Sequence, residues 1–213
     1  PYVLTILPSD QYGLNAESVD RSTGVPYPTE KVSFKFPKLQ TATLSNGAKI
    51  VLAQRSGVPL VEMNFQFDFG YAQENNDELG FTNFMMDMLN EGTKKYSSLQ
   101  FDEVLDSLGS NLGFGSGLDT SVISVSSLKG NLGDTLDLAK EALINPTFPQ
   151  AEIDRIKNQT LASIVQEENR PASIAYRNIG KLLYGDSHPY GKPLTGIGLS
   201  NTISRITREN IID

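Results

Sequence analysis

Hydrophobic and polar residues alternate along residues 61–69. The apolar positions of this run are Val61, Met63, Phe65, Phe67 and Phe69. Because successive side chains of a strand point to opposite faces, the alternation predicts a strand with one apolar face and one polar, solvent-facing face. Two shorter alternating runs flank Asn46-Gly47, a pair that supplies the positive backbone angles of a tight turn. We therefore predict a β-hairpin over residues 44–52, followed by a strand over 61–69.

After residue 80, the apolar positions recur at the spacings of three and four that are typical of amphipathic helices. Helices are predicted over residues 80–93, 97–108, 131–143, 150–168 and 171–183, and a closing helix begins near 207–209. Ser97 or Ser98 is expected to cap the second of these helices, and Gly109 to end it. Asn131 is expected to cap the third. Between these two helices, residues 111–117 and 119–128 are predicted to form a pair of strands.

The composition narrows the classes of function. The 213 residues carry a net charge of −7, which argues against a nucleic-acid partner because phosphate binding needs a basic face. No apolar run approaches the roughly 20 residues that a membrane-spanning helix requires. The chain has no cysteine, so disulfides, thiolate metal sites and cysteine nucleophiles are excluded.

Three further features carry little chemistry. His188 is the only histidine, so no two-histidine metal site can form within this chain, and we expect it to be structural. The adjacent Glu167 and Glu168 point to different faces of a helix, so we interpret them as a solvated helix end. The glycines of residues 113–117 lack the spacing of a dinucleotide-binding fingerprint.

Residues 80–93 hold the candidate site. They resemble the inverted zinc motif of the pitrilysin and insulinase-type metallopeptidases, in which a helix has the approximate pattern G-x-A-H-F-x-E-H-M-x-x-x-G-T. The matching positions are Gly80, Phe84, Met88, Gly92 and Thr93. Asn83 and Asp87 stand at the two histidine positions, and Met86 stands at the glutamate position. The resemblance puts the third metal ligand, a glutamate of a later helix, on Ser163.

These replacements remove the chemistry that the motif would otherwise imply. Two imidazoles four residues apart share one helix face and can bind one zinc ion, while the residue between them reaches the bound water. A single carboxamide and a single carboxylate, as at Asn83 and Asp87, are poor substitutes. Met86 has no titratable group and cannot accept a proton from water. We therefore expect this chain alone to be inactive, with no catalytic residue, metal ligand or cofactor of its own.

Taken alone, residues 80–93 would suit an ordinary core-packing helix equally well. The family resemblance rests on further matches that follow in order along residues 40–213. They are the hairpin at 44–52, the Asn-Pro-Thr-Phe-Pro junction at 145–149, the helix and proline of 155–171, the His-Pro-Tyr-Gly loop at 188–191 and the helix start at 207–209. The resemblance implies an α+β fold with a largely antiparallel sheet covered by helices, like the metallohydrolase domain of mitochondrial processing peptidase-like proteins.

The resemblance also implies a domain organisation. Residues 1–37 are interpreted as the end of a preceding domain plus an inter-domain linker, because residues 2–8 resemble a last strand and the prolines that follow are typical of a linker. Residues 38–213 are then a peptidase-like α+β domain with a degenerate metal site.

Relatives in this family pair homologous halves around a chamber, and in many of them only one half keeps the metal. The resemblance thus implies a non-catalytic domain of a pitrilysin-like zinc metallopeptidase that shapes the chamber and helps to hold peptide substrate. Its expected partners are a peptide and a zinc-bearing catalytic half, on the same or a separate polypeptide. We also expect an exposed apolar surface toward that half, and a periplasmic or otherwise exported location.

Two alternatives remain open at this point. The chain could be a purely structural or assembly subunit of such a complex, without peptide contact. It could also be an enzyme that binds a different cation through Asp87, Asn83 and Glu91. Metal analysis separates the cation enzyme from the other two functions, and peptide protection of sheet-edge amides separates those two from each other.

Overall fold

The computed structural model describes residues 22, 24, 33, 35–55 and 57–212. The chain divides into two compact units, residues 1–55 and 56–213. The predicted end of a preceding domain and its linker, residues 1–37, lie outside the described residues except at 22, 24, 33 and 35–37. Among the described residues, the first unit contains one hairpin, and the second contains all the other elements.

The hairpin of the first unit confirms the turn prediction, with one difference. Strand β1 (Leu39–Thr43) pairs antiparallel with β2 (Lys49–Ala53). Gly47 has the expected positive φ of 87°, but Asn46 does not, because Phe148 is the only non-glycine residue with a positive φ in the described part of the chain. Asn46 stabilises the turn through its side chain instead, since its Oδ1 accepts the N–H of Ala48 at 3.1 Å.

A three-stranded antiparallel sheet forms the centre of the second unit. Its strands are β3 (Leu60–Phe67), β4 (Asn111–Ser116) and β5 (Ser121–Leu128). They lie in the order β3-β5-β4, so β5 is central and buries alternate residues such as Ile123 and Val125. Phe65 and Phe114 both lie opposite Ile123 in the register, and the three side chains therefore share one face. The predicted α+β fold with an antiparallel sheet is confirmed.

Strand β3 is an edge of this sheet, and the apolar face of its second half is partly uncovered. Phe65 and Phe67 of β3 and Phe69 just after it are 39%, 47% and 46% exposed, whereas Met63 packs against the core. Their register agrees with the predicted alternation, because Phe65 lies on the same face as buried Ile123. Helices α2 and α3, however, pack on β4 and β5. Alternation along a strand specifies which side chains share a face, but not whether another element covers that face.

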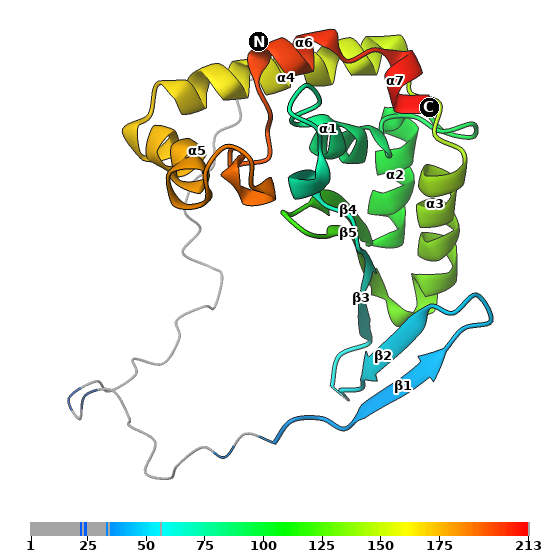
Figure 1. Cartoon of the computed structure of the whole chain (residues 1–213). Coiled ribbons are helices and arrows are strands. Elements are labelled where there is room, and N and C mark those ends of the chain that lie inside the picture. Colours follow the sequence, from blue (N-terminus) through cyan, green and yellow to red (C-terminus); the bar gives the residue numbers. More distant parts are fainter. Residues whose placement is uncertain (1–21, 23, 25–32, 34, 56, 213) are drawn as a thin grey trace. The chain divides into compact units, whose positions relative to one another are not determined.

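Helices make up most of the remaining second unit (Figure 1). They are α1 (Phe81–Met88), α2 (Ser98–Leu108), α3 (Leu132–Ile144), α4 (Gln150–Glu168), α5 (Pro171–Tyr184), α6 (Ser200–Arg205) and α7 (Arg208–Ile212). Three short 3₁₀ helices are η1 (Tyr71–Gln73), η2 (Lys129–Asn131) and η3 (Pro189–Gly191). Helices α2 and α3 lie side by side against the sheet, whereas α4 packs against α1, α5 and α6. Every predicted helix is present, although α1 ends earlier than expected.

A side-chain cap explains where α2 begins, and a glycine explains where it ends. The Ser97 hydroxyl accepts the backbone N–H of Gln100, and the Gln100 side chain accepts the N–H of Ser97 in return. Gly109 ends α2 with a φ of 58°, as predicted. Asn131 is the N-cap residue of α3, as predicted, but its side chain makes no cap bond and instead donates to the carbonyl of Leu108 at 2.8 Å. This bond ties the start of α3 to the end of α2.

Two clusters of buried apolar side chains form the core of the second unit. The first joins α1, α4, α6 and α7 to Ile123 of the sheet. The second joins α2 and α3 to β4 and β5, around Phe101 and Val125. The predicted apolar positions of the first helix all face the core, since Phe84, Met88 and Leu89 are buried and Phe81 and Met85 are partly buried.

The predicted solvated end of α4 is correct for Glu168 but wrong for Glu167. Glu168 is exposed. Glu167 accepts from Arg177 of α5 at 2.7 Å, and the buried Arg177 also donates to the carbonyl of Gly198 at 3.0 Å. The ion pair therefore connects α4 through α5 to the loop that precedes α6.

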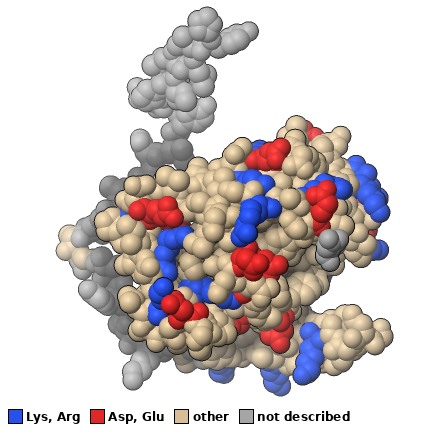
Figure 2. All heavy atoms as spheres, turned by 45° about the horizontal axis from the view of Figure 1, so that its top comes forward, with Lys and Arg blue, Asp and Glu red and all other residues tan. Residues whose placement is uncertain are grey.

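The surface carries charges of both signs. On the face drawn in Figure 2, Lys and Arg side chains are interspersed with Asp and Glu, and neither sign forms a continuous patch. Among the described helices, none is both long enough and apolar enough to cross a membrane.

Candidate functional site

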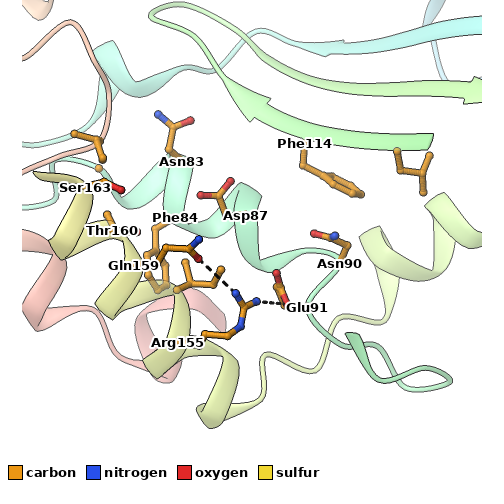
Figure 3. Close-up of a pocket in the computed structure, with 14 residues that line it drawn as sticks. Asn83, Phe84, Asp87, Asn90, Glu91, Phe114, Arg155, Gln159, Thr160 and Ser163 are labelled. Carbon is orange, nitrogen blue, oxygen red and sulfur yellow. Dashed lines mark hydrogen bonds and ion pairs between the residues drawn. The ribbon is translucent and has the colours of Figure 1, made fainter. Parts of the chain in front are cut away.

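A pocket of about 520 Å³ lies between α1 and α4, beside strand β4 (Figure 3). Three of the four predicted site residues line it: Asn83 and Asp87 from α1, and Ser163 from α4. Met86 does not line it. The structure therefore brings together the predicted ligand positions of two helices that are far apart in the sequence.

The start of α1 is held by a buried carboxylate. Glu74 accepts the backbone N–H of Gly80 at 2.8 Å and that of Thr82 at 2.6 Å, so it caps a helix whose first residues lack intrahelical partners. Burial raises the pKa of Glu74, and these two N–H groups partly oppose that rise. Gly80 has a φ of 91°, and a Cβ there would lie 2.6 Å from the carbonyl oxygen of Ile197. A glycine at this position thus allows the loop before α6 to approach α1.

Asn83 uses both ends of its carboxamide inside the protein. Its Oδ1 accepts the backbone N–H of Ser116 at 3.1 Å, and its Nδ2 donates to the carbonyl of Gly196 at 3.0 Å. The side chain therefore joins α1 to the end of β4 and to the loop before α6. The first predicted ligand position is occupied by a group that holds the fold together.

Asp87, one turn further along α1, is in the opposite situation. Its carboxylate makes no hydrogen bond or ion pair within the part of the chain that the structure describes, and its side chain is exposed to the pocket. Desolvation by the pocket walls raises the pKa of Asp87, and the nearby charge of Glu91 raises it further. The pocket therefore contains a carboxylate without a counter-charge.

Met86 belongs to the core rather than to the pocket. Only 4% of the residue is exposed, and it packs with Phe84, Met88 and Ile153 in the first apolar cluster. No proton acceptor stands at this position.

The α4 wall of the pocket offers neutral polar groups. Ser163 and Thr160 lie one turn apart, and their hydroxyls have no hydrogen-bond partner among the described residues. Ile156 continues this wall with an apolar side chain. Across the pocket, Phe114 of β4 contributes an aromatic ring (Figure 3).

An ion-pair network at the end of the pocket was not foreseen from the sequence. Arg155 lies 2.6 Å from the Glu91 carboxylate, 2.6 Å from that of Glu152, and 3.4 Å from the Gln159 side-chain oxygen. The hydrogen bond that Arg155 donates to Glu91, followed by the one that it donates to Glu152, raises the pKa of Arg155 further above its usual range. The pair of Glu152 and Arg155 could have been predicted from the sequence, because residues three apart on a helix are neighbours. The link to Glu91 depends on how α1 and α4 cross.

The polar groups of the pocket do not suit zinc. Asn83 is engaged at both ends, Ser163 offers a neutral hydroxyl, and only Asp87 offers a free carboxylate. Among the described residues, no group of three His, Cys, Asp or Glu side chains is arranged to hold a metal ion. The alternative cation site through Asp87, Asn83 and Glu91 is also a poor set of ligands, because Glu91 is already paired with Arg155.

His188 does not line the pocket and has a structural environment. Its Nδ1 accepts the backbone N–H of Tyr190 at 3.0 Å, and its ring stacks on Tyr184 at a centroid distance of 5.0 Å. The Tyr190 hydroxyl in turn donates to Asp119, which connects this loop to the β4–β5 turn.

Comparison with known proteins identifies relatives of this chain. Residues 49–196 match the family described as Insulinase (Peptidase family M16). An uncharacterized zinc protease of Rickettsia felis is 25% identical over 169 residues, which are 79% of this chain and 40% of that protein. The mitochondrial-processing peptidase subunit beta of Rattus norvegicus is 22% identical over 183 residues, 86% of this chain and 37% of that protein. A non-peptidase homolog of Helicobacter pylori, YmxG, is 23% identical over 184 residues, which are 83% of this chain and 41% of that protein.

Solved structures show the same fold. A peptidase M16 inactive domain from Pseudomonas fluorescens matches with a TM-score of 0.75 and 29% identity, over 82% of this chain and 42% of the other. The periplasmic protease PqqL of Escherichia coli matches with a TM-score of 0.70 and 20% identity, over 85% of this chain and 21% of the other. The chain spans about two fifths of the length of the curated relatives that it matches.

Proposed function

Because the chain belongs to the insulinase family, peptidase family M16, we propose that it serves as a non-catalytic domain that holds extended peptide for a zinc-bearing half. Its relatives include an inactive M16 domain and a non-peptidase homolog, so a degenerate M16-like domain is in keeping with them. The observation that carries the proposal is the pocket between α1 and α4, which has no metal-binding set yet lies beside an open sheet edge.

The outer edge of β4 has free backbone groups. Gly117 N–H bonds to the carbonyl of Thr120 across the turn to β5, so in the antiparallel ladder the groups of Ser116, Phe114 and Leu112 point away from β5. The bond from Ser116 N–H to Asn83 agrees with this direction. The N–H and C=O groups of Phe114 and Leu112 therefore remain available to pair with an added strand.

Exposed apolar side chains support a partner half. Phe65 and Phe67 of β3, and Phe69 just after that strand, are accompanied by a second exposed set on α5. That set includes Leu182, Leu183 and Tyr184, which are 81%, 68% and 49% exposed. Large exposed apolar side chains of this kind suit a protein–protein contact. The partner is a homologous half that carries zinc, and by analogy with the periplasmic protease PqqL the location is an exported one.

Hydrogen exchange with mass spectrometry tests peptide holding against a purely structural role. An excess of an unstructured peptide should slow exchange at the amides of Leu112 and Phe114, because a paired strand protects the outward-facing N–H groups. The amides of the β3 edge serve as an internal control. If saturating peptide leaves residues 111–116 unprotected, the chain is a structural or assembly domain.

A pair of variants isolates the edge bond. Phe114→Pro removes an N–H that points away from β5, so the ladder itself stays intact. Phe114→Ala removes the same aromatic packing but keeps the N–H. We expect peptide affinity to fall further for Phe114→Pro than for Phe114→Ala, by about three- to tenfold for one backbone hydrogen bond.

A further inference from the structure

The charges that line the pocket between α1 and α4 do not balance. The charged residues among them are Asp87, Glu91 and Arg155. Glu91 and Arg155 neutralise each other at 2.6 Å, and Arg155 is held further by Glu152 and Gln159 of its own helix. Arg155 is therefore not free to move toward Asp87, whose negative charge remains without a partner.

An uncompensated carboxylate in a partly desolvated pocket is unfavourable, which is why the pKa of Asp87 is raised. A bound cation would relieve this cost. Asp87 is exposed to the pocket, so its carboxylate is available to a cationic ligand, whereas Asn83 on the same helix is fully engaged.

The other walls suit an ammonium group. Phe114 presents an aromatic ring, and an ammonium group over such a ring gains a cation–π attraction. The hydroxyls of Thr160 and Ser163 offer acceptors for the remaining N–H bonds of such a group. A volume of about 520 Å³ accommodates one lysine side chain with water.

The pocket also lies where a peptide side chain would arrive. The side chains of Phe114 and Leu112 line the pocket, so this face of β4 is the pocket face. A strand added to the β4 edge places every second side chain on the same face as its cross-strand neighbour. A residue opposite Phe114 would therefore project toward α1 and Asp87.

From this geometry we infer that the pocket binds the primary ammonium group of an extended peptide, either a lysine side chain or a free N-terminus, with Asp87 as its counter-ion. The inference rests on the proposed function, since it takes the peptide to lie along β4. The former metal site would then select which peptides the domain holds.

The test measures peptide affinity for the full chain by fluorescence anisotropy. The probes are nine-residue peptides with an acetylated N-terminus and a central lysine, acetyl-lysine or norleucine, plus a norleucine peptide with a free N-terminus. We expect the lysine peptide to bind about three- to tenfold more tightly than the acetyl-lysine peptide, as for a partly exposed ion pair. Asp87→Asn should abolish that preference and leave the acetyl-lysine affinity unchanged.

Asp106→Asn is the matched control, because Asp106 is an exposed carboxylate on α2 that does not line the pocket. It should keep the lysine preference. An equal loss in both variants would mean that overall charge, not the pocket, attracts lysine, and would overturn the inference.

The remaining outcomes separate the two proposals. Tight binding of all peptides without any lysine or N-terminus preference overturns the ammonium site but leaves peptide holding intact. Preference for the free N-terminus alone identifies the terminal amine as the source of the ammonium group. No binding of any peptide, together with unprotected β4 amides, overturns peptide holding and the ammonium site with it.

Discussion

The two turns of α1 that carry the predicted ligand positions differ in how their polar side chains are satisfied. In the first turn, Asn83 bonds to Ser116 and Gly196, and Glu74 caps the helix start. In the last turn, Asp87 faces the pocket without a partner among the described residues. A polar residue at a predicted ligand position can thus be part of the scaffold or remain available for a ligand. Burial and hydrogen bonding, not residue type alone, tell the two cases apart.

The largest effect, on zinc affinity, should come from placing a histidine in both turns. The combined substitutions Asn83→His, Asp87→His and Ser163→Glu put three zinc ligands around one pocket with one position open. We expect zinc affinity to rise at least about a thousandfold over the parent chain, or about 4 kcal/mol. Titration with a zinc indicator after dialysis measures it. A correctly folded triple variant without added affinity would show that α1 and α4 are not in the family register.

The scaffold turn should be most sensitive at its cap. Glu74→Ala leaves the buried N–H groups of Gly80 and Thr82 without an acceptor, and we expect a loss of about 3 kcal/mol in the free energy of unfolding. Urea denaturation measures the loss. Glu78→Ala, which changes an exposed carboxylate of the same loop, should have little effect. Equal stability of the two variants would show that Glu74 does not support α1.

A smaller effect is expected at Asn83. Asn83→Ala removes two hydrogen bonds and should lower the free energy of unfolding by about 2 kcal/mol. Asn83→Asp keeps an acceptor for Ser116, but it turns a carboxylate oxygen toward the carbonyl of Gly196 and adds a like charge one turn from Asp87, so it should be no more stable than the alanine variant. Chemical denaturation ranks the three proteins. An alanine variant as stable as the parent would contradict a scaffold role for Asn83.

The smallest effect is expected at Asp87, where a substitution should raise the free energy of unfolding rather than lower it. The pKa of Asp87 is raised in the folded state. At pH values between the ordinary and the raised pKa, the folded state therefore binds more protons than the unfolded state. The free energy of unfolding then falls as pH rises through that window. Asp87→Asn should remove this dependence and raise stability at neutral pH, by no more than about 0.5 kcal/mol. Denaturation curves from pH 3 to 7 measure the difference. A destabilised asparagine variant would mean that Asp87 has a partner in solution.

Local patterns predicted the elements of this domain well. Alternation located β3, spacings of three and four located the helices, and Ser97 with Gly109 located both ends of α2. The predictions that failed wholly or in part involve side chains with more than one available partner. Asn131 bonds to Leu108 rather than to its own helix, and Glu167 bonds to Arg177.

The order of residues along the chain by itself determined which side chains of an element share a face and where α2 begins and ends. The assignment of Asn83, Met86, Asp87 and Ser163 to the family's metal-ligand and base positions stays a prediction from the resemblance. Only the tertiary structure decided that Asn83 is engaged, Met86 is buried and Asp87 is free. The physical reason is range. Periodicity and capping act within a few residues, whereas hydrogen-bond satisfaction at Asn83 and its absence at Asp87 depend on β4, α4 and the loop before α6, which lie far away in the sequence.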